Sequence, residues 1–92
     1  MTHPKTPSLL WTEEAKAHCW KKHRVRWETL DRIPGAGDLR LEPQRFGRLM
    51  LQGSVEGKCY RLIGDVLDVE DMLLEPVTGY RYAKGDKKGD KP

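Results

Sequence analysis

Apolar and polar residues follow two different periods along this chain of 92 residues, and the period changes after residue 37. Between Trp11 and Ile33 the apolar positions recur every three to four residues, which is typical of amphipathic helices. From residue 38 onward apolar and polar residues tend to alternate, which is typical of strands with one buried face. The pattern therefore predicts helices first and a sheet second.

The first predicted helix begins after Thr12, which is a suitable N-cap. Glu13 and Glu14 follow at the end of the helix where the dipole favours negative charge. The apolar stripe of this helix has four-residue spacing and consists of Ala15, Cys19 and His23. A second, shorter helix carries Trp27, Leu30 and Ile33 or Val25 on one side, and the Pro-Gly-Ala-Gly run at 34–37 stops it.

Four segments with strand periodicity follow, at residues 38–43, 45–55, 58–68 and 72–82. In the second segment Leu49, Leu51 and Val55 fall on the face opposite Arg48 and Met50. Glu56-Gly57 is a hairpin turn in which Gly takes positive φ. Pro76 cannot donate to a ladder, so the last strand is an edge strand or is broken there.

We therefore predict an α+β fold with two N-terminal helices followed by a three- to four-stranded antiparallel sheet. The expected organisation is an extended lead-in over residues 1–8, one domain over 9–83 and a disordered tail over 84–92. A helix covers one face of the sheet, and the other face meets solvent, a ligand or a partner. The three tryptophans, Trp11, Trp20 and Trp27, are expected in the core.

Composition and charge indicate which partners, cellular location and thiol state to expect for the protein. The net charge of +3 is compatible with a nucleic-acid partner without requiring one. The sequence shows no signal peptide and no membrane-spanning segment, and it has only two cysteines, so we expect a cytoplasmic protein with reduced thiols. Spacing alone leaves a Cys19–Cys59 bridge open.

The sequence contains no recognisable metal or cofactor motif. His18 and His23 are five residues apart, which predicts different faces of the helix, and no carboxylate or thiol completes a ligand set. Cations and phenols instead gather at the helix end and along the strands, as Lys22, His23, Arg45, Arg48, Tyr60, Arg61, Tyr80, Arg81 and Tyr82.

Such residues are what metal-free RNA cleavage needs. A base takes the proton of the 2′-hydroxyl, a fixed cation stabilises the charge that grows on the phosphate, and an acid protonates the leaving oxygen. Each residue also has an ordinary structural interpretation: His23 as a helix-end residue, the arginines as solvent-facing strand residues, and the tyrosines as core. The hypothesis of an RNA site therefore rests on the combination of these residues.

The order of three segments resembles the BrnT family of type II toxins, which has a RelE-like fold. The segments are "LLWTEEAKAHCWKKHRVRWETLDRI", "GRLMLQGSVEGKCYRLIGDVL" and "VTGYRY". The matching positions are Trp11, Ala15, Lys22, His23, Val25, Arg48, Gly53, Gly57, Tyr60, Thr78, Tyr80 and Arg81. The chain departs from the family pattern at Arg24, where Gly is usual, at Arg26, where Ser or Thr is usual, and at Glu75-Pro76. Where members of the family continue into a C-terminal helix, this chain has a Lys-Gly-Asp tail.

The resemblance implies a ribonuclease toxin that inhibits translation and is held inactive by a cognate antitoxin. Its partners would be RNA and that antitoxin, with no cofactor, no metal and no membrane, and with homo- or hetero-oligomerisation left open. The catalytic candidates it implies are Lys22, His23, Arg48, Tyr60 and Arg81. The residues expected to bind RNA are Arg45, Arg61 and Tyr80.

Two other functions stay open on the same fold. One is a non-catalytic module that holds another protein on its open sheet face or on an unpaired strand edge. The other is an RNA-binding protein without chemistry, whose affinity would depend strongly on salt. Convergence of Lys22, His23, Tyr60 and Arg81 on one pocket would favour the ribonuclease.

Overall fold

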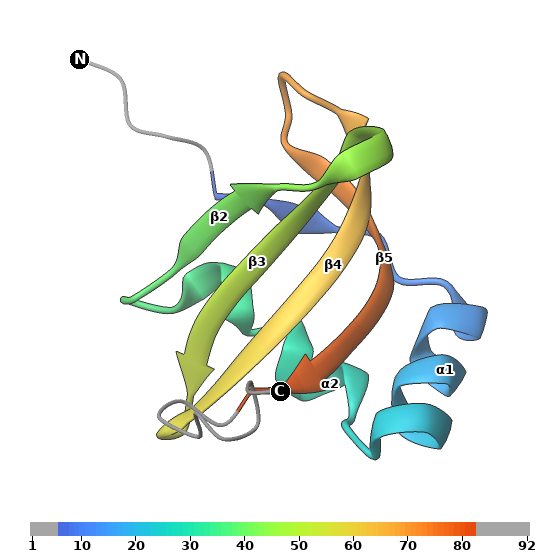
Figure 1. The fold of residues 1–92 in the computed structure, drawn as a ribbon, viewed down its shortest axis with the longest axis vertical. Helices are drawn as coiled ribbons and strands as arrows, with labels where there is room; N and C mark the ends of the chain where they lie inside the picture. Colours follow the sequence, from blue (N-terminus) through green and yellow to red (C-terminus); the bar gives the residue numbers. More distant parts are fainter. Residues whose placement is uncertain (1–5, 83–92) are drawn as a thin grey trace.

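A twisted five-stranded sheet carries the fold, in the strand order β1-β5-β4-β3-β2 (Figure 1). The computed structural model describes residues 6–82 of the chain. Its strands are β1 (Ser8–Leu9), β2 (Arg40–Pro43), β3 (Arg48–Val55), β4 (Lys58–Asp68) and β5 (Leu73–Arg81). Its helices are α1 (Glu13–His23), α2 (Trp27–Leu30) and two 3₁₀ turns, η1 (Ile33–Gly35) and η2 (Arg45–Gly47).

The α+β class is as predicted, but the prediction of a purely antiparallel sheet of three or four strands is wrong. The short strand β1 precedes both helices and pairs in parallel with β5, Ser8 opposite Leu73 and Leu9 opposite Leu74. The other three strand pairs are antiparallel. A two-residue strand has too few positions to show a period in the sequence, so the pattern does not distinguish β1 from an extended segment.

The predicted start of α1 is confirmed. The Thr12 side chain accepts a hydrogen bond from the Ala15 backbone N–H at 3.1 Å, and Glu13 and Glu14 occupy the first turn. Ala15 and Cys19 on the predicted stripe are buried. Figure 1 shows α1 beside β5, with which it is in contact, so this helix lies along the edge of the sheet.

The second helix is shorter than the sequence pattern indicated. It ends at Leu30, and Ile33 belongs to η1, where Pro34 allows only a tight turn. Leu30 and Ile33 are nevertheless fully buried, as their spacing predicted. Trp11 and Trp27 are half-buried with ring centroids 5.8 Å apart, whereas the prediction that Trp20 lies in the core is wrong, because 46% of it is exposed.

The alternation of β3 follows the prediction. Leu51 and Val55 are buried against the helical layer, and Glu56-Gly57 forms the hairpin turn with positive φ at both residues. The buried core is Ala15, Cys19, Val25, Leu30, Ile33, Leu51, Val55, Leu62 and Leu74. In Figure 1 α2 and η1 lie behind the sheet, and no element of residues 6–82 covers the near face of β2–β5. The sheet thus has one packed and one open face.

The prediction that the last strand is an edge strand or is broken at Pro76 is wrong, because β5 runs unbroken through Pro76 and lies between β1 and β4. The proline instead lies beside an irregularity in the β4–β5 ladder. Ile63 pairs with Thr78 but Gly64 pairs with Pro76, so Val77 is the extra residue of a β-bulge. Beyond the bulge the register brings Tyr60 opposite Arg81 and Arg61 opposite Tyr80. The bulge therefore sets which side chains meet at the end of the sheet.

Both cysteines are free thiols, so the structure shows no Cys19–Cys59 bridge. Burial raises the pKa of the Cys19 thiol. Within residues 6–82 no helix is long and apolar enough to cross a membrane. The predicted tail, residues 84–92, lies outside the described residues, and the predicted domain boundaries stay predictions.

Candidate active site

The C-terminal end of α1 carries the residues that point to chemistry. The chain reverses at Arg24, which takes a left-handed conformation with φ 55°, and its backbone N–H donates to Trp20 O at 2.9 Å. This conformation costs an L-residue about 1–2 kcal/mol, whereas glycine adopts it freely. The turn buries Val25 and leaves His23 beside β5.

His23 is part of a small polar cluster on the edge of β5. Its Nε2 atom lies 3.3 Å from Thr78 Oγ1, and His18 Nε2 lies 3.2 Å from the same oxygen. The two imidazole centroids are 5.8 Å apart, and the ring of Tyr80 lies 5.6 Å from that of His23. The expectation that His18 and His23 occupy separate faces is therefore wrong, because both side chains reach the one hydroxyl from adjacent turns.

The environment of His23 favours the neutral form of its imidazole. Partial burial lowers the pKa of His23 below its usual value, and the nearby His18 and Lys22 lower it further through charge repulsion. A neutral imidazole has a free lone pair and can take a proton, which is the requirement for a general base near neutral pH.

His23 also lines a basic pocket between α1, α2 and the end of the sheet. The pocket has a volume of about 340 Å³. Its lining residues are Trp20, His23, Arg24, Val25, Arg26, Thr29, Tyr60 and Arg81. None of these lining residues is acidic. Two arginines from the connection between α1 and α2 and one from β5 thus line one pocket with a histidine and a phenol, an arrangement that suits a phosphate group.

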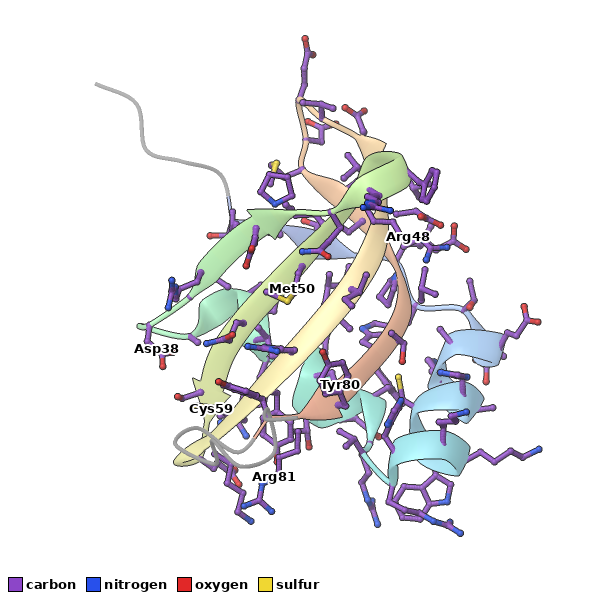
Figure 2. The ribbon with its side chains drawn as sticks, in the orientation of Figure 1. Asp38, Arg48, Met50, Cys59, Tyr80 and Arg81 are labelled. Atoms are coloured by element: carbon purple, nitrogen blue, oxygen red, sulfur yellow. The ribbon has the colours of Figure 1, made fainter. Side chains whose placement is uncertain are left out.

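The structure brings together three of the five catalytic candidates. His23, Tyr60 and Arg81 line the basic pocket, whereas Lys22 is exposed on the last turn of α1 and does not line it. Arg48 lies at the opposite end of the sheet from Arg81 (Figure 2). There its Nε atom donates to Asp65 Oδ1 at 2.9 Å, so its charge is already paired.

Of the three residues expected to bind RNA, Arg45 and Arg61 lie away from His23, whereas Tyr80 lies beside it. Arg61 stands on β4, where its Nε donates to Gln52 at 2.9 Å and its guanidinium lies 3.7 Å from the ring centroid of Tyr82. Tyr80, on β5, contacts His23. Arg45 is exposed in η2, three residues before Arg48.

Sequence reasoning missed four residues of this region: Trp20, Arg24, Arg26 and His18. Arg24 and Arg26 were noted only as departures from a family pattern, although two extra cations beside Lys22-His23 were a usable signal. Spacing is a usable signal for Trp20 as well, because it directly follows Cys19 and therefore lies off the apolar stripe of α1. Among the described residues no group of His, Cys, Asp and Glu has the arrangement of a metal site.

A mixed five-stranded sheet with α1 along its edge, α2 behind one face and a basic pocket at its end defines a small α+β protein with an open sheet face. A solved structure of this class is that of the ribonuclease toxin BrnT from Brucella abortus, which has a TM-score of 0.65 to this chain. The likeness covers 86% of this chain and 100% of that one at 16% sequence identity.

This likeness confirms the predicted resemblance to BrnT at the level of the fold. No model of a known protein family matches the sequence, and no curated protein matches it.

Proposed function

We propose that this protein is a BrnT-like ribonuclease toxin that cleaves RNA without a metal ion and thereby inhibits translation. The observation that supports this function best is the place of His23, which lines the arginine pocket on one side and touches the Thr78 hydroxyl on the other. The BrnT fold supplies the second line of support. The proposal includes a cytoplasmic location and a cognate antitoxin as partner.

The proposed reaction uses three groups of the pocket. Neutral His23 takes the proton of an RNA 2′-hydroxyl, whose oxygen attacks the adjacent phosphorus. Arg81 and Arg24, which line the same pocket, stabilise the charge that grows on the phosphate oxygens. The bond from phosphorus to the 5′-oxygen breaks, that oxygen receives the Tyr60 proton, and a 2′,3′-cyclic phosphate forms.

The test is incubation of purified protein with single-stranded RNA, beside His23→Ala, Arg81→Ala and Tyr60→Phe variants. Loss of the base should slow cleavage about 10²–10⁴-fold, and loss of the arginine about 10²–10³-fold. Arg48→Ala is the matched control, because it removes an equal charge at the far end of the sheet. The proposal is wrong if the wild-type protein leaves RNA intact and its induction in cells causes no growth defect.

The open sheet face favours a second candidate, a non-catalytic module that holds a protein partner. Met50 and Ile63 on adjacent strands are only half-buried there, and no element of residues 6–82 covers them. For such a module, substitution of Met50 by Glu would abolish capture of the protein encoded beside it, while His23→Ala would have no effect on any cellular phenotype. RNA cleavage that depends on His23 would exclude this candidate as the main function.

A further inference from the structure

Trp20 is an exposed tryptophan with two arginines beside its ring. It lies on the outer side of α1 with 46% of its surface exposed. The guanidinium of Arg24 lies 5.2 Å from its ring centroid, and that of Arg26 lies 6.0 Å away.

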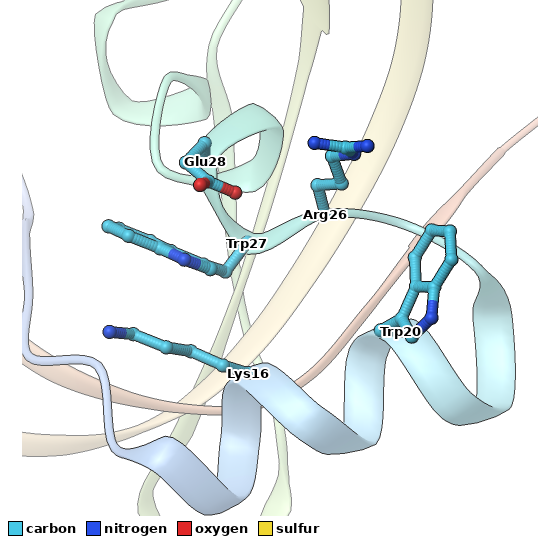
Figure 3. A pocket seen from close by; sticks show the side chains of 5 residues that line it. All are labelled: Lys16, Trp20, Arg26, Trp27 and Glu28. Atoms are coloured by element: carbon cyan, nitrogen blue, oxygen red, sulfur yellow. The ribbon is translucent and has the colours of Figure 1, made fainter.

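The ring of Trp20 forms one wall of a second pocket, shown in Figure 3. This pocket has a volume of about 240 Å³. Its lining residues are Lys16, Trp20, Arg26, Trp27 and Glu28. The volume is below the about 300–1,000 Å³ of pockets that take drug-sized ligands, so the space suits a single planar ring system.

The second pocket adjoins the basic pocket that contains His23. Trp20 and Arg26 line both of them. A strand of nucleic acid with one phosphate beside His23 would therefore bring a neighbouring base to Trp20. Arg26 lies between the two positions and can contact the connecting phosphate.

The walls of the second pocket differ in chemistry. Lys16 Nζ lies 4.3 Å from the ring centroid of Trp27, closer than the guanidiniums of Arg24 and Arg26 lie to the ring of Trp20. Trp20 is also 46% exposed, so its ring is the more accessible stacking surface. Glu28 is the only acidic residue among the five that line the pocket, and within residues 6–82 its carboxylate has no hydrogen-bond or ion-pair partner. The pocket thus offers an aromatic surface together with an unpaired acceptor.

We propose that this pocket binds an unpaired guanine base next to the cleaved phosphate, an inference that rests on the proposed ribonuclease function. Aromatic side chains stack on any base, so Trp20 provides affinity. Glu28 provides the preference, because guanine alone among the four bases presents two adjacent N–H donors, on N1 and on the 2-amino group, to one carboxylate. Adenine and cytosine would bring a ring nitrogen acceptor against that carboxylate, which repels it.

The experiment measures binding of 2′-O-methyl pentanucleotides, which lack the attacking hydroxyl and cannot be cleaved. The oligonucleotides contain uridine with one central guanine, inosine or adenine. We expect guanine to bind most tightly, and inosine, without the 2-amino group, to bind more weakly. Trp20→Ala should weaken binding about tenfold or more, and Trp20→Phe should restore most of it. Glu28→Gln should abolish the preference for guanine over adenine.

Phe46→Ala is the matched control, because Phe46 is 90% exposed on η2 and lies in neither pocket. Circular dichroism checks that every variant is folded, and cleavage of unmodified RNA is measured in parallel. Unchanged binding by Trp20→Ala, with cleavage by the wild type intact, overturns the base pocket and leaves the ribonuclease standing. Binding that depends on Trp20, without cleavage, supports the base pocket and overturns the ribonuclease. Equal affinity for guanine and adenine overturns the role of Glu28.

Discussion

The Nε2 atom of His23 lies 3.3 Å from the Oγ1 atom of Thr78, which joins the end of α1 to β5. His18 Nε2 approaches the same oxygen at 3.2 Å. A hydroxyl has a single proton, so Thr78 can donate to one imidazole only, and the other imidazole must donate from its own Nε2–H. The hydroxyl therefore links the tautomers of the two rings and positions His23, which also lines the basic pocket.

Replacement of Thr78 by Val should test this positioning role. Valine has nearly the same shape but no hydroxyl, so His23 loses a hydrogen bond worth about 0.5–1.5 kcal/mol. We expect kcat for RNA cleavage to fall about tenfold with little change in KM, and the pH profile to shift. Thr78→Ser, which keeps the hydroxyl, should restore both. A Thr78→Val enzyme with the rate and the pH profile of the wild type would show that the hydroxyl has no role.

Cleavage should rise with pH through the lowered pKa of His23 and reach its plateau before neutral pH. Burial is the main cause of the lowered pKa, and His18 and Lys22 add to it. Lys22→Ala or His18→Ala should therefore move the pKa of His23 part of the way back toward about 6.5. NMR titration of the His23 ring measures this directly. Lys21→Ala, one residue away on the same helix end, is the control. Equal His23 titration in the wild type and both variants would contradict the electrostatic account.

The lowered pKa of His23 also predicts how the stability of the protein depends on pH. The unfolded chain binds a proton to His23 at a higher pH than the folded chain does, because the folded pKa is the lower one. The contribution of His23 to stability is therefore complete above about pH 6.5 and falls as the pH drops through that value toward the folded pKa. Urea denaturation at a series of pH values should show a shallower dependence in this range for His23→Gln. An identical dependence in both proteins would contradict the prediction.

Local patterns predicted the elements of this protein well where the signal lies within a few residues. Thr12 before two glutamates fixed the start of α1, and the alternation around Leu51 fixed the buried face of β3. Glu56-Gly57 fixed the hairpin. Each of these depends on short-range sterics or on a cap, so the sequence alone was sufficient.

The sequence alone could not predict which residues far apart along the chain lie close together in the fold. Arg48 and Arg81 both follow the family pattern, yet they lie at opposite ends of the sheet. Whether two strand residues share a pocket depends on strand order and on the bulge at Val77, which no single segment encodes. His18 and Thr78 are 60 positions apart in the sequence, and their contact likewise requires the packing of α1 beside β5.

Arg24→Gly should lower the rate of RNA cleavage without lowering the stability of the protein. Glycine removes the cost of about 1–2 kcal/mol for the left-handed conformation at φ 55°, but it loses more entropy on folding, by about 0.4–1 kcal/mol. The free energy of unfolding should therefore stay the same or rise by up to about 1.6 kcal/mol. Cleavage should fall nonetheless, because the basic pocket loses a cation. Paired urea denaturation and cleavage assays measure the two effects, and a destabilised Arg24→Gly protein would contradict the account of the turn.

Gly64→Ala should destabilise the protein by about 1–3 kcal/mol. A Cβ at this position would meet the backbone of β5, 2.9 Å from Glu75 O and 3.3 Å from the Pro76 Cα. A backbone cannot move aside as a side chain can, so the β4–β5 ladder must shift at the bulge that sets Tyr60 opposite Arg81. Cleavage should therefore fall at temperatures where the variant is still folded. Gly37→Ala is the control, because a Cβ there meets no atom within 4 Å and its free energy of unfolding should stay within about 0.5 kcal/mol of the wild type. Equal stability of the two variants would show that the close approach of β4 and β5 at Gly64 does not hold the register.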